Sequence, residues 1–397
     1  MSKKHFLKST ILLLCLALIF SFNFFLQTMA ATKTKDITSQ VVILGNPFTK
    51  STFAKNVWDM QVYNGRIYLG SGDCGNNAGA TPVIYYDSAT NKFITQFTVS
   101  EEQIDIYKVL NGKLYIPGTD STESWDFGNF YTLESDQWTK FRTIPNANHV
   151  WDMAYFNGQL YAATGTTKPG KGEVLASKDL GKTWASQVPQ NKRFYAINDW
   201  ATALLELDNK LYATGTLVIP SVSTISVFSK FSNLLVSDGT SMVAQPYDTR
   251  LLPGVKNNYL FGIKRQITMG NNLLYLAVKL PGTNDLWSPD AMYVAPGITQ
   301  ALRIAFPASD ALPSDIVTRG NSVYVLAYIK NSSSSYTNVV YKSDDLKNWT
   351  ELFRFNTGTF ARSFEELNGD FYFGLGCSYD VLAPSTGNIL KVDCTAY

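Results

Sequence analysis

Three aspartates in comparable places along the sequence, Asp59, Asp152 and Asp315, are the first candidates for chemistry. Each stands close to the beginning of a segment rich in apolar residues. Carboxyl groups can act as proton donor or base in the cleavage of glycans, which makes these three the candidate catalytic residues. An equally good interpretation of Asp59 and Asp152 is a capping carboxylate that holds a loop and touches no ligand.

Tryptophans beside two of these aspartates favour the binding of a sugar. Trp58 and Trp151 directly precede Asp59 and Asp152. Aromatic rings stack on the apolar faces of sugars, while acidic, amide and arginine side chains bind the hydroxyl groups. The predicted ligand-binding residues are Trp58, Asp59, Asp105, Trp125, His149, Trp151, Asp152, Arg265, Trp287 and Arg362.

Residues 1–30 have the pattern of a signal peptide. Lys3, Lys4 and Lys8 precede an apolar run of 16 residues from Ile11 to Leu26, and the segment ends at the small residue Ala30. A membrane-spanning helix needs about 18 residues or more, so an uncleaved anchor is the weaker alternative. We therefore expect export to a secreted or periplasmic location, a short linker over 31–38 and one domain over 39–397.

The charge balance of the exported chain excludes some classes of partner. The leader takes away three of the 34 basic residues, which leaves 31 basic against 32 acidic residues. A nearly neutral chain lacks the positive field that binds a phosphate backbone, so we expect no nucleic acid. His149 is then the only histidine, which excludes metal sites built on several histidines. We expect no cofactor, no metal, no membrane span after cleavage, and a monomer that binds a glycan or a secreted or cell-surface protein.

A repeat runs through the rest of the chain and predicts the elements that position these residues. Its seven copies are spaced by 46 to 63 residues and are marked by Tyr68, Tyr115, Tyr161, Tyr212, Tyr275, Tyr324 and Tyr372. Pairs such as Asn64–Gly65 stand just before each tyrosine and are typical of two-residue hairpin turns. In blade five we expect this turn at Asn271–Asn272. The period suits one propeller blade, so the predicted fold is an all-β, seven-bladed propeller of four-stranded antiparallel blades.

The two ends of the chain are expected to close the ring. The seventh repeat ends at Tyr397 after its third strand, and the apolar segment from Ser39 to Gly45 can supply the fourth. The alternative is a floppy N-terminal extension. The longest interval marks an insertion in blade four after Leu217, which can be a lid, a partner contact or a packed excursion. We take the packed excursion as the default.

Two cysteines are expected to come together when the ring closes. Cys74 and Cys377 both follow second strands, in blades that become neighbours at the seam. We therefore predict a disulfide between them. A bridge between Cys377 and Cys394 is the alternative.

The segment from Ser177 to Trp184, SKDLGKTW, resembles the Asp-box, or bacterial neuraminidase repeat, of sialidase-like propellers. The pattern Ser-x-Asp-x-Gly-x-Thr-Trp is matched by Ser177, Asp179, Gly181, Thr183 and Trp184, and a second copy keeps Ser343, Asp345 and Trp349. The resemblance implies a turn between third and fourth strands, capped by the aspartate and packed by the tryptophan. It supports the fold and says little about activity.

The same resemblance implies what a sialidase site would contain. Sialidases use three arginines, a tyrosine paired with a glutamate, and an acidic proton donor. The leading arginine motif has only an echo here, FRTIP from Phe141 in an outer strand of blade two, and no Tyr–Glu pair is evident in the sequence. We therefore predict a binding module for a glycan or partner protein on the loop face around the central channel. A glycoside hydrolase or lyase is the alternative.

Overall fold

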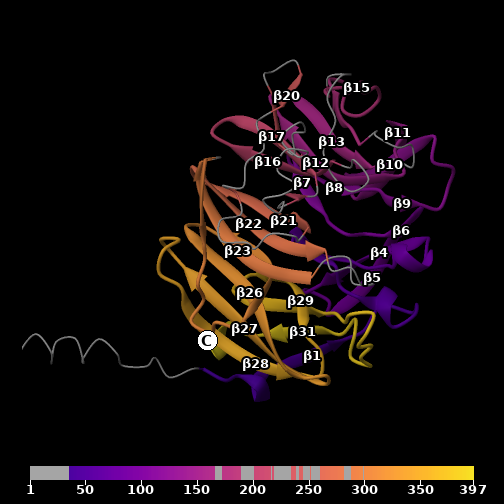
Figure 1. The fold of residues 1–397 in the computed structure, drawn as a ribbon. Coiled ribbons are helices and arrows are strands. Elements are labelled where there is room, and N and C mark those ends of the chain that lie inside the picture. The colour runs from indigo at the N-terminus through magenta and orange to yellow at the C-terminus, as the bar shows by residue number, and fades with distance from the viewer. Residues whose placement is uncertain are drawn as a thin grey trace, which may run out of the picture. The chain divides into compact units, whose positions relative to one another are not determined.

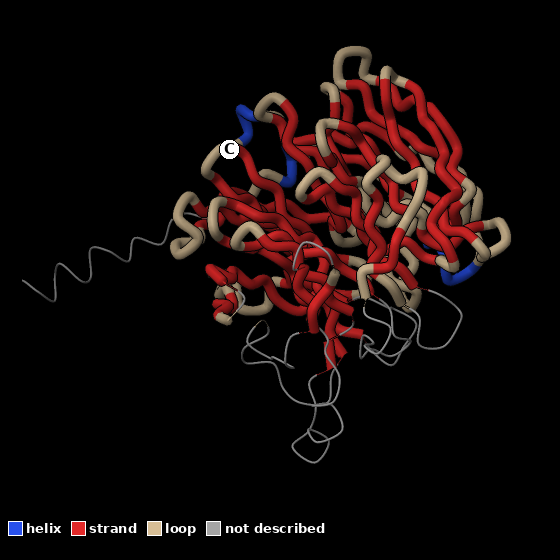
Figure 2. Tube along the Cα trace, turned by 90° about the horizontal axis from the view of Figure 1, so that it is seen from above, coloured by secondary structure: helices blue, strands red, loops and turns tan. Residues whose placement is uncertain are grey.

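The computed structural model describes residues 35–165, 172–188, 201–215, 217–218, 234–237, 241–244, 251, 260–280, 288–297 and 299–397. Strands dominate the compact unit Ile37–Tyr397 (Figures 1 and 2). None of the helices in these ranges is long and apolar enough to cross a membrane. The predicted signal peptide and Trp287 lie outside the described residues.

The strands form seven antiparallel sheets, which confirms the predicted seven-bladed propeller. Blade 1 holds β2 (Asp59–Tyr63), β3 (Arg66–Gly70), β4 (Thr81–Asp87) and β5 (Lys92–Val99). Blade 2 holds β7 (Lys108–Leu110), β8 (Lys113–Pro117), β10 (Phe127–Glu134) and β11 (Gln137–Pro145). Blade 3 holds β12 (His149–Phe156), β13 (Gln159–Gly165), β14 (Val174–Ser177) and β15 (Ala185–Ser186), and its sheet is extended by β9 (Thr119–Ser121) and β6 (Glu101–Gln103).

The remaining four blades follow the same order. Blade 4 holds β16 (Ala201–Leu207), β17 (Lys210–Gly215), β19 (Leu234–Ser237) and β20 (Met242–Ala244). Blade 5 holds β21 (Leu260–Met269), β22 (Asn272–Leu280), β23 (Ser288–Gly297) and β24 (Gln300–Arg303), joined by β18 (Leu217–Val218). Blade 6 holds β25 (Leu312–Arg319), β26 (Ser322–Ser332), β27 (Ser335–Ser343) and β28 (Thr350–Thr357). Blade 7 holds β29 (Ala361–Leu367), β30 (Asp370–Leu375), β31 (Ile389–Val392) and β1 (Val42–Gly45).

Tight turns join the first two strands of each blade. In blade 1, Asn64 and Gly65 both have positive φ, 49° and 72°, as a type I′ turn requires. Blade 5 differs from the prediction, because Met269 pairs with Asn272 and the turn is therefore Gly270–Asn271, one residue earlier. Gly270 has a φ of 57°, and a glycine at the first central position is typical of the alternative type II′ turn.

The ring closes through β1, as predicted, although the strand is shorter than expected. Val42 pairs with Lys391 and Ile43 with Leu390, and Figure 1 shows the indigo β1 beside the yellow β31. Ser39 belongs instead to the 3-10 turn η1 (Thr38–Gln40). Because Ile43 is 66% exposed, backbone hydrogen bonds hold this strand. The apolar anchor is Ile37, which is fully buried in a phenylalanine-rich cluster between blades 6 and 7.

The core is divided among the interfaces between neighbouring blades. Each interface contains a cluster of buried apolar side chains, and a small eighth cluster of Tyr328, Tyr336 and Phe360 lies between blades 6 and 7. The repeat tyrosines lie in these clusters or pack against them, which explains their regular spacing. The blade-four insertion is described only at Leu217 and Val218, which pair with β21 of blade 5.

The Asp-box segment forms the capped turn that its sequence indicates. It connects β14 to β15, and the Asp179 carboxylate accepts hydrogen bonds from the Thr183 amide (2.9 Å) and hydroxyl (2.6 Å). Because of these bonds the pKa of Asp179 is lowered to about 2. The Trp184 ring packs edge-on against Phe130 of blade 2, with centroids 5.8 Å apart. The turn therefore joins two blades and does not contact the central channel.

Replacing Gly181 tests the packing of the Asp-box turn against blade 2. Gly181 has a φ of +92°, and a Cβ there would overlap the Phe130 ring. Gly181→Ala is expected to lower the free energy of unfolding by about 2–4 kcal/mol, from left-handed backbone and overpacking together. Gly158→Ala is the matched control, because Gly158 has a φ of +78° and open space around it, so only about 1–2 kcal/mol should be lost. Equal losses of unfolding free energy for the two variants, measured by urea unfolding, would contradict this packing.

Candidate functional site

A bulged segment of β21, residues 264–266, crosses the central channel. The pairing of β21 with β22 shifts register between Lys264 and Ile267, and Arg265 has a φ of +53°. A non-glycine residue in this conformation costs about 1–2 kcal/mol. The bulge directs Lys264, Arg265 and Gln266 towards the inner strands of other blades, and we call these three residues the plug.

Each plug side chain binds a predicted site aspartate. Arg265 Nη1 lies 2.6 Å from Asp59 Oδ1, and its Nε lies 3.3 Å from Asp315 Oδ1. Lys264 Nζ lies 2.6 Å from Asp105 Oδ2. Gln266 donates to the Asp152 carboxylate and to the Leu204 carbonyl (3.3 Å). Blade 5 is thereby tied to blades 1, 2, 3, 4 and 6.

The three candidate catalytic aspartates also link each inner strand to the next blade. Asp59 Oδ2 accepts from the Tyr107 amide at 2.6 Å and Asp152 Oδ2 from the Leu204 amide at 2.8 Å. Asp315 Oδ2 accepts from the Phe364 amide at 3.0 Å. These contacts fit the capping interpretation, since a carboxylate with several donors in place has few lone pairs left for a substrate.

Burial and neighbouring charges shift the pKa values of these groups in opposite directions. Burial raises the pKa of Asp315 to about 7, although the Arg265 guanidinium opposes the shift. The pKa of Asp59 is raised for the same reason. Burial would also raise the pKa of Asp105, but Lys264 and Arg265 outweigh it and the net shift is downward. The Arg265 side chain keeps its charge, because the surrounding carboxylates raise its pKa in spite of burial.

The plug separates two cavities. One opens at the beginning of the inner strands, on the predicted loop face, and is bounded by Trp58, Trp151, Phe360, Arg362 and the three plug residues. We call it the cup. The other, of about 290 Å³, lies further along the inner strands and is lined by charged side chains that include Lys108, Arg319 and Glu365. The plug therefore forms the floor of the cup.

The structure brings six of the ten predicted ligand-binding residues to the cup. These are Trp58, Asp105, Trp151, Asp152, Arg265 and Arg362. Asp59 lies in the lining of the other cavity, together with Asp315. His149 stacks behind Trp151 with ring centroids 4.5 Å apart, and burial lowers its pKa to about 4. Trp125 lies on the connection from β9 to β10, outside the cup lining.

Arg362 is held between two aromatic rings at the wall of the cup. Its guanidinium carbon lies 4.3 Å from the centroid of Trp58 and 5.0 Å from that of Phe360. It donates to Asn56 Oδ1 (3.0 Å) and to the Cys377 carbonyl (2.8 Å). Sequence analysis missed Phe360, although its place just before a first strand matches that of Trp58.

The predicted disulfide across the seam is wrong. Cys74, Cys377 and Cys394 are free thiols, so neither of the two proposed pairings is present among the described cysteines. Asn56 binds Cys377 instead, since its Oδ1 accepts from the Cys377 amide (2.7 Å) and its Nδ2 lies 3.7 Å from the sulfur. Stacking of Phe53 on Tyr379 (3.5 Å) adds to the seam. Noncovalent contacts therefore hold the seam where a disulfide was predicted.

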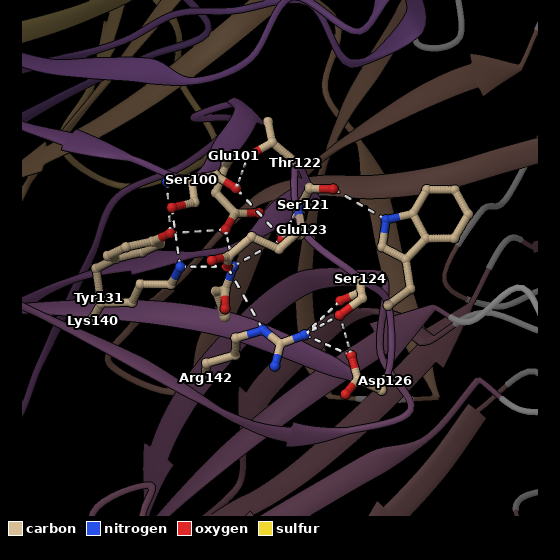
Figure 3. A network of polar contacts seen from close by, with 12 residues as sticks. Ser100, Glu101, Ser121, Thr122, Glu123, Ser124, Asp126, Tyr131, Lys140 and Arg142 are labelled. Atoms are coloured by element: carbon tan, nitrogen blue, oxygen red, sulfur yellow. Dashed lines mark hydrogen bonds and ion pairs between the residues drawn. The ribbon is translucent and has the colours of Figure 1, made fainter.

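A buried polar network lies between blades 1 and 2 (Figure 3). Glu101 Oε1 accepts from the Tyr131 hydroxyl at 2.9 Å and from Asn129 Nδ2 at 2.7 Å. This Tyr–Glu pair could not be recognised in the sequence, because 30 residues separate its members. Both side chains are fully buried and lie outside the cup lining, so we assign the pair no sialidase role. Burial raises the pKa of Glu101 to about 8.

Comparison with known proteins supports the fold alone. No family model matches the sequence, so membership of the Asp-box family stays a prediction, and no curated protein matches it. Similar solved structures include Kuenenia stuttgartiensis hydrazine synthase, with a TM-score of 0.51, 11% sequence identity, and coverage of 88% of this chain and 98% of that chain. Two others have a TM-score of 0.47: the β-propeller domain of the Trilobed protease from Pyrococcus furiosus (8% identity, 84% and 94% coverage) and the polysaccharide lyase Uly1 (12%, 88% and 92%).

Removing the central cation tests the plug. Arg265→Met leaves the Asp59 and Asp315 carboxylates buried without their guanidinium, which should lower the free energy of unfolding by about 3–5 kcal/mol near neutral pH. The carboxyl pKa values rise further in the folded variant, so it binds protons that the unfolded chain releases, and the loss shrinks as the pH falls. Urea unfolding at mildly acidic and mildly alkaline pH measures this. Lys279→Met, at a more exposed ion pair with Asp290, is the control, and a pH-independent loss would contradict the assignment.

The raised pKa of Glu101 predicts a second way in which the stability of the fold depends on pH. Its folded pKa of about 8 lies above the ordinary value of 4.5, so between these values the folded state holds a proton that the unfolded state has lost. Its contribution to stability therefore falls as the pH rises through that window. Glu101→Gln cannot ionise, and its melting temperature should fall less than that of the natural protein between mildly acidic and alkaline pH. The exposed Glu134→Gln is the calorimetric control, and parallel curves for all three proteins would refute the assignment.

Proposed function

We propose that this protein is a binding module that takes a glycan into the cup. The observation that carries the proposal is the combination of two aromatic walls, Trp58 and Trp151, with a hydrogen-bonding floor made by the plug. A sugar ring offers apolar faces to such walls and hydroxyl groups to such a floor. The plug separates the cup from the second cavity.

The charges of the cup favour a neutral or acidic sugar. Asp105 and Asp152 are engaged by Lys264 and Lys108, at 2.6 and 2.9 Å. Arg362 brings a positive charge to the wall, where the rings of Trp58 and Phe360 fix its orientation. A planar guanidinium held in this way suits a carboxylate or a pair of hydroxyl groups on the ligand.

The bonding of the carboxylates argues for binding without turnover. The two oxygens of Asp152 accept from the amides of Met153 and Leu204, both at 2.8 Å, and also face Lys108 and Gln266. The lowered pKa of Asp105 keeps it ionised, and an ionised carboxylate cannot donate a proton to a leaving group. Asp59 and Asp315 lie on the other side of the plug. The hydrolase or lyase alternative thus lacks a group poised for proton donation in the described cup.

Export of the protein belongs to the same proposal. The leader over residues 1–30 and the nearly neutral mature chain suit a protein that meets glycans outside the cytoplasm. A monomer with one cup then needs no partner subunit to complete its site.

A glycan array and a panel of chromogenic glycosides test the proposal together. The natural protein should bind one class of glycan and turn over none of the glycosides. Trp151→Ala should weaken that binding at least about tenfold, or about 1.4 kcal/mol, because it removes one stacking wall. Leu302→Ala, at an exposed apolar position on β24, should bind as the natural protein does. Turnover that disappears in Asp152→Asn would support the enzyme alternative, and no binding to any glycan would overturn the proposal.

A further inference from the structure

Two exposed aromatic rings lie outside the cup, Trp125 on the connection between β9 and β10 and Phe127 at the first position of β10. Trp125 is 48% exposed and Phe127 is 39% exposed. Single exposed apolar side chains are common on protein surfaces, whereas these are two aromatic rings only two residues apart. We call this pair and its flanking polar residues the platform.

The platform is held in a fixed shape before any ligand arrives. Trp125 Nε1 donates to the Ser121 carbonyl at 3.1 Å, which anchors the edge of the ring and leaves a face open. Arg142 Nη2 donates to Ser124 Oγ and to Asp126 Oδ1, each at 2.6 Å, and its guanidinium lies 5.8 Å from the Phe127 centroid. A surface organised in advance loses little entropy when a ligand binds.

The buried network contacts the loop that carries Trp125, and Figure 3 shows Glu101 of the network together with Ser121 and Glu123 of that segment. Asn129 Nδ2 donates to Ser121 Oγ at 3.0 Å, next to the carbonyl that anchors Trp125. Ser121 Oγ also accepts from the Glu123 amide at 3.1 Å, and Lys140 binds the Glu123 carboxylate. The network therefore positions the strand that carries the loop.

Strand β9 connects the platform to the cup. Thr119, at one end of β9, pairs with His149, and His149 stacks on Trp151 of the cup wall. Ser121, at the other end, holds Trp125. Two residues of extended strand span only about 7 Å, so β9 is a short link between the residue that pairs with His149 and the residue that anchors Trp125.

We propose that the platform is a second subsite for the same glycan, so that the natural ligand is a polysaccharide whose chain runs from the cup across Trp125. This inference rests on the proposed function of the cup. A polymer that occupies both surfaces gains affinity, because its second contact is intramolecular.

The platform suits a sugar better than a protein. Its charged side chains are already paired with one another, Arg142 with Asp126 and Lys140 with Glu123, so little net charge is offered to a partner. Stable protein interfaces bury about 800 Å² on each side around a contiguous apolar centre. Two rings bordered by ion pairs match the alternating apolar faces and hydroxyl groups of a sugar chain instead.

Binding of short and long oligosaccharides tests the subsite. The probes are the disaccharides and octasaccharides of β-linked glucose, N-acetylglucosamine and galacturonic acid, measured by calorimetry. The natural protein should bind the octasaccharide of one series at least about tenfold more tightly than its disaccharide. Trp125→Ala should bring the octasaccharide affinity close to that of the disaccharide and leave the disaccharide affinity unchanged.

Two controls separate this inference from the function of the cup. Trp125→Phe keeps a ring face without the indole N–H and should retain most of the chain-length effect, whereas Leu302→Ala should retain all of it. Equal affinity for both lengths in the natural protein, or an unaltered length effect in Trp125→Ala, would overturn the subsite while leaving the cup intact. Absence of binding to every probe would overturn the cup and the subsite together.

Discussion

The structure depends on a single buried guanidinium shared by carboxylates from different blades. Arg265 faces Asp59 of blade 1 and Asp315 of blade 6, while each of those carboxylates also accepts a backbone amide from the following blade. Breaking such an arrangement exposes charges that have no water to replace the lost partner. The ring of inner strands is therefore fixed by geometry as well as by apolar packing.

The plug determines the shape of the binding region. Without the bulge at Arg265 the inner strands would surround an open channel, and the aromatic residues at their beginnings would line a passage. With it, the same residues enclose a cup whose floor is polar and rigid. The left-handed backbone of Arg265 stores strain of the kind that persists only where the surroundings compensate for it, here through ion pairs across the channel.

Sequence analysis recovered what local chemistry determines and missed what depends on side-chain direction. Turn pairs such as Asn64–Gly65 favour a two-residue hairpin, so their seven occurrences predicted the blades. The missing fourth strand of the last repeat predicted the closure by β1. The bulge at Arg265 carries no such signal, because no glycine marks it. The disulfide failed for a related reason: blade order placed Cys74 and Cys377 in neighbouring blades, but Asn56 occupies the contacts of Cys377 at the seam. Five of the six predicted binding residues in the cup lie at or near the starts of first strands, which share a face, whereas Arg265 reaches it through the bulge inside β21.

The contacts that form the plug also occupy the carboxylates that a catalytic role would require. Asp59, Asp152 and Asp315 each accept a hydrogen bond from a backbone amide of the next blade. These central carboxylates therefore hold neighbouring blades together. Among the described residues, Trp58, Trp151 and Arg362 line the cup without accepting an amide from the next blade. In the proposed binding mode, the aromatic rings of the cup and the oriented Arg362 guanidinium contact a sugar chain, and the platform at Trp125 lengthens that surface.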